Sequence, residues 1–131
     1  MILVDTSVLI DFFKGVKNRA SNKFRSVLLQ NIPFGINSFI YQEVLQGAKS
    51  EGEYEDLQKY LVTQHFFHPK EPVNSFTRAA RIYFECRQKG ITIRSTIDCI
   101  IAQTAIEHNL SLLHNDNDFK AMAKVVKLRF Y

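Results

Sequence analysis

The chain has 131 residues, 46% of them hydrophobic, which is enough for one domain with a single buried core. No apolar run reaches the roughly 18 residues of a membrane span, and no basic segment with a long apolar stretch opens the sequence. We therefore expect one soluble, cytoplasmic domain over residues 1–131. Cys86 and Cys99 match neither a zinc pair nor a disulfide framework, so we interpret both as reduced core thiols.

The net charge of +4 is unevenly distributed along the chain. No acidic residue occurs from Phe12 to Gln42, and this stretch contains Lys14, Lys17, Arg19, Lys23 and Arg25. The last part of the chain has the same bias, with Lys120, Lys124, Lys127 and Arg129. A basic surface attracts polyanions such as nucleic acids. Solvated helix faces explain any single one of these residues about equally well.

Short apolar runs alternate with segments of helical periodicity. In chain order we expect a strand at 1–4, helices at 6–13 and 18–30, a strand at 33–36, a helix capped by Asn37 or Ser38, a helix at 53–62, a strand at 66–67, helices at 73–89 and 96–108, a strand at 110–113, a helix at 118–124 and a strand at 125–130. Thr6 or Ser7 should cap the first helix, and Thr96 or Ser95 the helix at 96–108. This alternation predicts an α/β fold with a parallel sheet covered on both faces.

Four acidic residues lie where an apolar segment meets a polar junction or a helix: Asp5, Glu43, Asp98 and Asp116. Asp5 and Asp116 follow the ends of predicted strands, where parallel α/β sheets bind their ligands. A carboxylate in such a setting costs several kcal/mol unless it is paired, hydrogen-bonded or bound to a cation. Oxygen-only ligation suits Mg²⁺ or Mn²⁺, so the four acids together predict a site for one of these ions.

A metal held by carboxylates can activate a water molecule for in-line attack on a phosphodiester, which predicts hydrolysis of a nucleic-acid backbone. Other phosphate chemistry is disfavoured. The sequence contains no GxxxxGK[ST] loop and no GxGxxG after a strand. A phosphatase of the haloacid-dehalogenase type needs a second Asp two residues after the first, and that position is Ser7.

The acidic residues occur in four blocks, which in order are MILVDTSVLIDFFKG, SFIYQEVLQGA, TIDCIIAQTA and LLHNDNDF. Together these blocks resemble the PIN-domain ribonucleases, and specifically the VapC-type toxins of bacterial toxin–antitoxin systems. The resemblance implies a three-layer α/β/α sandwich with a central, mainly parallel sheet of four to five strands. It also implies an endoribonuclease that needs Mg²⁺ or Mn²⁺, forms homodimers, and is held inactive in a hetero-oligomer with a VapB-type antitoxin.

The resemblance assigns roles to individual residues. Asp5, Glu43, Asp98 and Asp116 match the acidic quartet of the family, and Ser7 matches a small hydroxyl residue that supports the first Asp. These five residues are the core of the implied site.

Four further residues are candidates with open alternatives. Asp118 matches a second acid of the last block, which either ligates a second metal through water or only caps the last helix. His114 and Asn115 stand where the family usually has Thr; His114 contacts substrate phosphate, assists proton transfer, or is structural. Arg94 is either a phosphate contact or an exposed loop cation.

Two other functions compete with a toxin ribonuclease: a catalytically silent PIN-like module that binds RNA or antitoxin, and a nuclease that acts on DNA flaps. The intact acidic quartet argues against the first, and the lack of insertions that could clamp a duplex argues against the second. An antitoxin segment would need an apolar groove, for which Phe12, Phe13, Phe39 and Tyr41 are candidate walls, and an inserted basic side chain could neutralise the acids.

Overall fold

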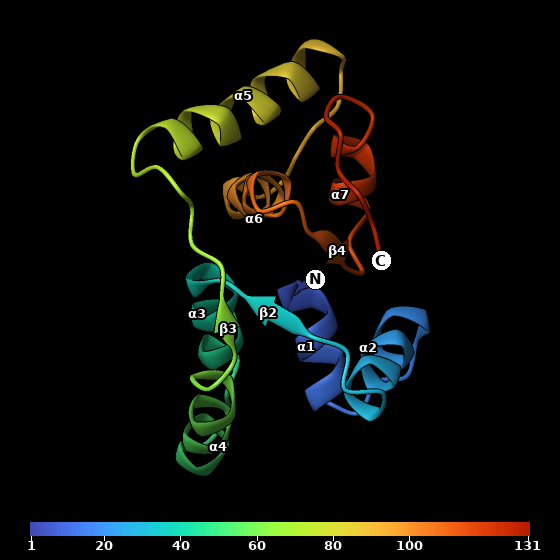
Figure 1. The fold of residues 1–131 in the computed structure, drawn as a ribbon, viewed down its shortest axis with the longest axis vertical. Coiled ribbons are helices and arrows are strands. Elements are labelled where there is room, and N and C mark those ends of the chain that lie inside the picture. The colour runs from blue at the N-terminus through green and yellow to red at the C-terminus, as the bar shows by residue number, and fades with distance from the viewer.

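Four short parallel strands form the centre of the computed structural model, which describes residues 1–131 (Figure 1). The strands are β1 (Ile2–Val4), β2 (Phe34–Ile36), β3 (His65–Phe66) and β4 (Ser111–Leu113), in the spatial order β3-β2-β1-β4. Strand β1 pairs in parallel with β2 on one side and β4 on the other. Its three residues are buried, as expected for an apolar strand covered on both faces.

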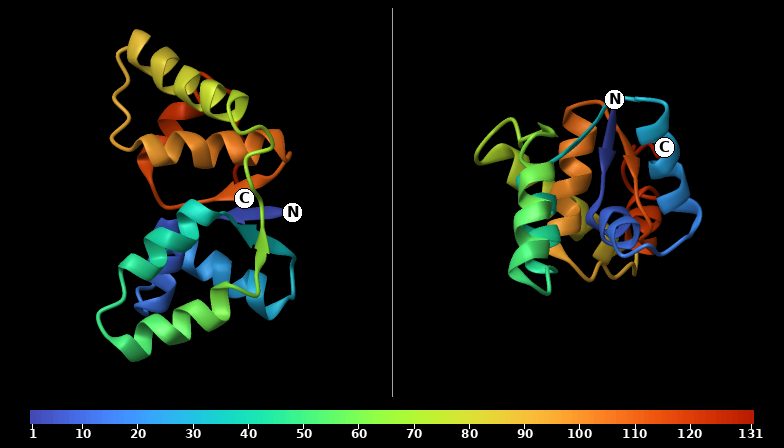
Figure 2. Two further views of the ribbon diagram at one scale, coloured as in Figure 1. Left: turned by 90° about the vertical axis from the view of Figure 1, so that its left-hand side faces the viewer. Right: turned by 90° about the horizontal axis from the view of Figure 1, so that it is seen from below.

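Helices cover both faces of the sheet. The helices are α1 (Thr6–Phe13), α2 (Arg19–Leu29), α3 (Ser38–Gln46), α4 (Glu51–Leu61), α5 (Asn74–Gln88), α6 (Thr96–Glu107) and α7 (Asn117–Met122). In Figures 1 and 2 the first four helices lie on one side of the sheet and the last three on the other. The predicted three-layer α/β/α sandwich with a parallel central sheet is therefore confirmed.

The strand order brings two remote parts of the chain together. Connections from β1 to β2 and from β2 to β3 run in one direction across the sheet, whereas β4 returns to the free side of β1. The carboxyl ends of β1 and β4 therefore meet where the direction of winding reverses, which is the usual ligand crevice of such sheets. No helix of the structure is long and apolar enough to cross a membrane.

Polar side chains start most of the helices. Asn18, Asn37 and Ser50 accept hydrogen bonds from first-turn amides of α2, α3 and α4. The first helix differs from the prediction, because Asp5 itself is the cap and accepts from the Ser7 amide; the expected cap at Thr6 or Ser7 was wrong. Asp5 can do this because β1 ends one residue earlier and leaves its backbone extended.

The predicted strand at 125–130 was also wrong. After α7 the amides of Val125 and Val126 still donate to the carbonyl of Met122, so the backbone stays turned. The chain reaches the edge of β4 only at its end, where Phe130 forms an isolated parallel bridge with Leu112. The sheet therefore has four strands.

Buried residues of both layers form one continuous hydrophobic cluster around the sheet, in which Leu3, Phe24, Ile36, Ile101 and Leu112 are fully buried. Cys86 and Cys99 are free and buried, which confirms their interpretation as core thiols. The cluster makes the sheet a rigid base for residues at its carboxyl edge.

A close approach of β2 to β3 provides a test of this packing. A Cβ atom on Gly35 would lie 2.5 Å from Phe67 Cε2 and 2.7 Å from the His65 carbonyl oxygen. We expect Gly35→Ala to lower the free energy of unfolding by about 1–3 kcal/mol, measured by urea denaturation. Gly52→Ala is the matched control, because a Cβ there meets nothing within 4 Å. Equal stability of the two variants would contradict the close β2–β3 packing.

Candidate metal centre

Asp5 lies at the carboxyl end of β1 and is almost completely buried. Its Oδ2 accepts hydrogen bonds from the Ser7 amide at 3.0 Å and from Ser7 Oγ at 2.6 Å. Its Oδ1 is buried and has no hydrogen-bond partner. Burial raises the pKa of Asp5 to about 6, although the hydrogen bonds from Ser7 act in the opposite direction. A buried carboxylate oxygen without a partner is costly and is well suited to a cation.

Asp98 lies in the first turn of α6, as predicted, and is buried. Burial raises its pKa to about 7, with further contributions from the negative charges of Asp5, Asp116, Glu43 and Asp118. The charges of these four acids all act on Asp98, so the fold brings the predicted Asp5, Glu43 and Asp116 near it together with Asp118.

Three carboxylates form the centre of this cluster. Oxygen atoms of Asp98, Asp116 and Asp118 all lie within 4.8 Å of one another. Asp116 caps α7 by accepting from the Asp118 amide at 2.9 Å, so the alternative that Asp118 only caps this helix is wrong. The carboxylate of Asp118 is buried and faces the other acids. Such a group of oxygen donors fits a hard divalent cation, which would relieve their mutual repulsion.

Glu43 lies on α3 at the edge of the cluster and is half-buried. Its Oε1 accepts a hydrogen bond from Thr6 Oγ1 at 2.8 Å. Its charge contributes to the raised pKa values of Asp5 and Asp98. The structure thus brings the whole predicted quartet to one edge of the sheet, but it places Glu43 outside the group of three closest carboxylates.

A hydrogen-bond chain ties the loop after β4 to the first helix. The Asn115 amide donates to Ser7 Oγ at 3.0 Å, and Ser7 Oγ in turn donates to Asp5. The Asn115 side chain donates to Asp11 Oδ2 at 3.3 Å, and Asn18 donates to the same oxygen at 2.8 Å. Ser7 and Asn115 therefore support the acids by holding these backbone segments together.

Arg94 lies at the rim of the cluster. Its guanidinium is 3.5 Å from Asp116 Oδ1 and 3.5 Å from Asp118 Oδ2, and its amide donates to Asp118 at 3.0 Å. The side chain is 74% exposed, so these ion pairs are weak and exchange readily. Arg94 is thus a largely exposed counter-charge of the acids, and its contact with a phosphate stays a prediction.

His114 lies beside the cluster and contacts the rings of Phe119 and Phe130. Its Nδ1 lies 3.1 Å from the Asp116 amide nitrogen. An amide donates, so Nδ1 is the acceptor and the proton is assigned to Nε2. Burial lowers the pKa of His114, and the charge of Lys120 lowers it further. His114 is therefore neutral at neutral pH and has a structural contact.

Comparison with known proteins places this geometry in a family. The PIN domain family matches residues 2–125, which is most of the chain. The chain belongs to the PIN domain family. VapC ribonuclease Mb1587 of Mycobacterium bovis and ribonuclease VapC11 of Mycobacterium tuberculosis are each 30% identical to this PIN domain over 130 residues, which cover 98% of the chain and 96% of either relative.

Solved structures support the same fold. VapBC-1 from nontypeable Haemophilus influenzae has a TM-score of 0.74 at 20% identity, covering 100% of this chain and 97% of that one. FitAB bound to the IR36 DNA fragment has a TM-score of 0.72 at 20% identity, covering 100% and 94% of the two chains. These findings confirm the predicted family and its α/β sandwich.

Two residues of this PIN domain site escaped the sequence analysis. Thr6 positions Glu43, and Asp11 holds Asn115 and Asn18. The position of Thr6 directly after Asp5 at a strand end is a signal that could have singled it out. Asp11 is one helical acid among many, and its contacts depend on segments up to 104 residues away.

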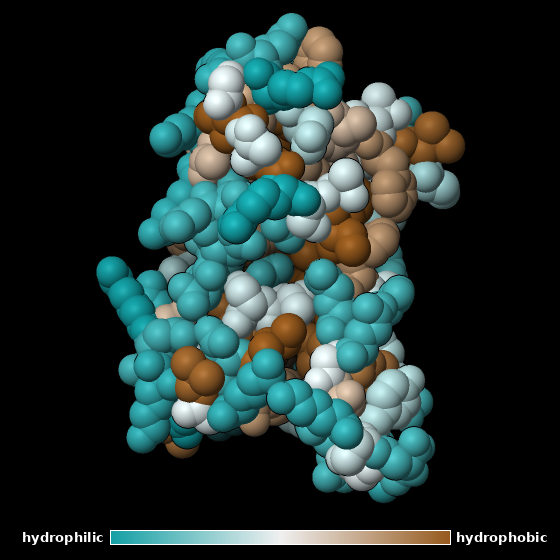
Figure 3. All heavy atoms as spheres, turned by 180° about the vertical axis from the view of Figure 1, so that it is seen from behind, coloured by the Kyte–Doolittle hydropathy of each residue, from teal (hydrophilic) through white to brown (hydrophobic).

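The four aromatic residues proposed as walls of one groove do not lie together in the PIN domain. Phe39 lines an apolar groove of about 350 Å³ with Phe76 and Tyr83, between α3, α5 and α6. Figure 3 shows hydrophobic side chains gathered in the middle of the molecule on the face opposite to that of Figure 1. In contrast, Phe12 packs against Phe24, with ring centroids 5.0 Å apart. Phe13 packs on Phe12 and on Tyr60, and Tyr41 packs on Phe66, so Phe12 and Phe13 lie together but away from Phe39 and Tyr41.

The support of Asp5 by Ser7 can be tested. Ser7→Ala removes the hydroxyl that donates to Asp5 and accepts from the Asn115 amide. We expect the free energy of unfolding to fall by about 1–2 kcal/mol and the pKa of Asp5 to rise further, because a hydrogen bond that lowers it is lost. Ser26→Ala on the exposed face of α2 is the control, with a change below about 0.5 kcal/mol. Urea denaturation measures the free energy of unfolding of both variants. Equal losses of stability in Ser7→Ala and Ser26→Ala would contradict the supporting role of Ser7.

The raised pKa values of Asp5 and Asp98 predict a pH-dependent stability without metal. Both carboxyls have a pKa of 3.8 in the unfolded chain, whereas in the folded protein the pKa of Asp5 is about 6 and that of Asp98 about 7. The unfolded state therefore binds fewer protons over this interval, and stability falls as pH rises from about 4 to about 7. In EDTA we expect Tm to be lower by about 5 °C or more at about pH 8 than at about pH 5.

Two comparisons identify the source of this fall. Asp98→Asn should flatten the pH profile, whereas Asp56→Asn, which changes an exposed acid on α4, should leave it as it is. Mn²⁺ added at about pH 8 should raise the Tm of the unaltered protein, because a cation binds the folded state. If the dependence of Tm on pH is the same in Asp98→Asn and in the unaltered protein, this explanation is wrong.

Proposed function

We propose that this PIN domain is the toxin of a toxin–antitoxin system and an endoribonuclease that hydrolyses RNA phosphodiester bonds with Mg²⁺ or Mn²⁺. The observation that carries the proposal is the convergence of Asp98, Asp116 and Asp118 within 4.8 Å, beside the unpartnered Oδ1 of Asp5. The names of the relatives at 30% identity, both ribonucleases, support the choice of reaction. The basic surface supports a polyanionic substrate.

Each acid has a proposed task. Asp5, Asp98 and Asp116 hold the cation, Glu43 completes the site from α3, and Asp118 binds either the same cation or a second one through water. When bound, the cation supplies an activated water and stabilises the charge that develops on the phosphate. Asp98, whose pKa burial raises to about 7, would bind such a cation as the deprotonated carboxylate.

The neighbouring residues position the substrate and the loop. Arg94 is free to turn from Asp116 and Asp118 to a phosphate once a cation neutralises these acids, because its side chain is exposed and its ion pairs are weak. Ser7 and Asn115 keep the β1 and β4 ends in register. His114 acts as a neutral hydrogen-bond donor through Nε2.

A VapB-type antitoxin is the proposed protein partner. The structures similar to this fold are described as VapBC and FitAB, one of them as a toxin–antitoxin complex from Klebsiella pneumoniae. The apolar groove that contains Phe39 supports a protein contact, either with the antitoxin or with a second copy in a homodimer. A basic side chain from the antitoxin would pair with Asp116 and Asp118, the position that Arg94 now occupies.

Cleavage of RNA tests the proposed reaction. Purified antitoxin-free protein should cut total cellular RNA into discrete fragments in Mg²⁺ or Mn²⁺, and EDTA should abolish the cleavage. We expect Asp98→Asn to lower the rate at least about 100-fold, because an acid that contacts the cation is lost. Asp56→Asn should cut at the normal rate. A single-stranded DNA with the sequence of one cleaved RNA region should remain intact.

The opposite outcome has a definite meaning. If folded protein binds RNA at low salt but cuts none with either ion, the chain is the catalytically silent binding module. Cleavage that continues in EDTA or in Asp98→Asn would instead show that the acids are not the reactive centre.

A further inference from the structure

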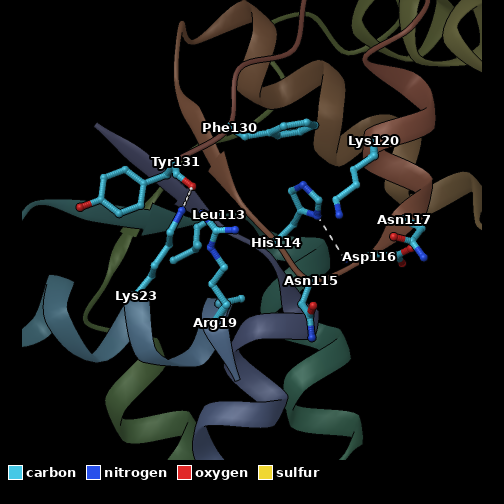
Figure 4. A pocket seen from close by; sticks show the side chains of 11 residues that line it. Arg19, Lys23, Leu113, His114, Asn115, Asp116, Asn117, Lys120, Phe130 and Tyr131 are labelled. Atoms are coloured by element: carbon cyan, nitrogen blue, oxygen red, sulfur yellow. Dashed lines mark hydrogen bonds between the residues drawn. The ribbon is translucent and has the colours of Figure 1, made fainter. Parts of the chain in front are cut away.

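A second cavity opens directly beside the acidic cluster. It has a volume of about 320 Å³ and shares Asp116 with the metal centre. Figure 4 shows Arg19 and Lys23 approaching it from α2 and Lys120 from α7, with His114 between them. The volume is at the small end of the roughly 300–1,000 Å³ range of ligand sites, so it suits a single nucleotide unit better than a duplex.

Positive charge dominates this cavity. No side-chain carboxylate lies within ion-pair distance of Arg19 or Lys120, since the side-chain ion pairs of the protein involve only Arg78, Arg81 and Arg94. Lys23 is already engaged, because it donates to the main-chain oxygen of Tyr131 at 2.9 Å. Arg19 and Lys120 are therefore the two cations of the cavity that have no side-chain acid as a partner. The one acid of the wall is Asp116, which already faces Arg94. Cations brought together without acids repel one another, and an anion would relieve this repulsion.

His114 lies on the wall of this cavity, between cations that come from α2 and α7. With Nδ1 engaged by the Asp116 amide, its Nε2–H is left as a donor. Asn115, on the same wall, contributes a further polar side chain.

We propose that this cavity is a phosphate subsite that binds a backbone phosphate of single-stranded RNA next to the bond that is cleaved. The inference rests on the proposed function for the identity of the substrate. Arg19 and Lys120 pair with the phosphate oxygens, and the Nε2–H of His114 donates a hydrogen bond to them. Because the cavity shares Asp116 with the metal centre, a strand that fills it is aligned with its neighbouring phosphodiester over the acids. Such positioning is how remote contacts contribute to catalysis.

Binding is measured without cleavage, so the test does not depend on activity. A short single-stranded RNA with a fluorescent label is titrated with protein in EDTA, and anisotropy reports Kd at several salt concentrations. The test variant is Arg19→Gln with Lys120→Gln. The matched control is Lys14→Gln with Lys17→Gln, which removes the same charge from exposed positions of the same basic stretch outside the cavity. Thermal unfolding verifies that both are folded.

We expect the test variant to weaken RNA binding on the order of tenfold and to reduce the slope of log Kd against log salt by about 1. The control should change Kd by less than about threefold. Equal losses in the two variants would mean a diffuse charge effect and would overturn the subsite. An unchanged Kd in the test variant would also overturn it.

A scan of the oligonucleotide distinguishes a backbone phosphate from a free one. One linkage at a time is replaced by a neutral methylphosphonate. The unaltered protein should lose affinity at one linkage in particular, and the test variant should be insensitive there, because the two changes remove the same contact. If inorganic phosphate competes with the RNA for the protein while no single methylphosphonate linkage lowers the affinity, the cavity binds free phosphate and the proposal is wrong. RNA binding with this pattern but no cleavage in Mg²⁺ would leave the subsite standing and refute only the nuclease.

Discussion

The electrostatic repulsion among carboxylates at one edge of a buried sheet is the constraint on which the rest of the site depends. Asp5 and Asp98 are buried deeply enough that their pKa values rise to about 6 and about 7, so the folded protein resists their ionisation. The hydrogen bonds that Ser7 donates to Asp5 offset only part of this cost, and the exposed Arg94 pairs with Asp116 and Asp118 instead of these two acids. A divalent cation bound among these acids would offset it more fully.

The sheet topology creates that constraint. Because β4 returns to the free side of β1, two acids more than a hundred residues apart stand at adjacent strand ends. The link from Asn115 through Ser7 to Asp5 joins these ends by direct hydrogen bonds, and Asp11 fixes the same loop from α1. The geometry of the acids is therefore supported by neighbouring backbone as well as by the core beneath them.

Charges of opposite sign meet at Asp116. On one side lie the carboxylates, and on the other lie Lys23, which donates to the main chain of Tyr131, and Arg19 and Lys120, which pair with no side-chain carboxylate. A nucleic-acid strand has the matching requirements, because it needs a cation at the reacting phosphate and positive side chains at the phosphates beside it. This complementarity explains how a small domain with a shallow site could hold a flexible substrate in one register.

The sequence by itself determined the strands β1, β2 and β4, the cluster of acids and the family, since each depends on a short apolar run followed by a polar residue at a fixed offset. It misplaced the cap of α1 and added a strand at 125–130, because a short apolar segment looks alike in a strand and in a turn that packs on the core. Only the tertiary structure decided that Asp118 joins Asp98 and Asp116, that Arg94 pairs with two of them, and that α2 and α7 place cations around one cavity. These contacts join side chains from segments that are far apart in the sequence. The packing of the helices on the sheet sets where these side chains point, and the local sequence pattern does not predict that packing.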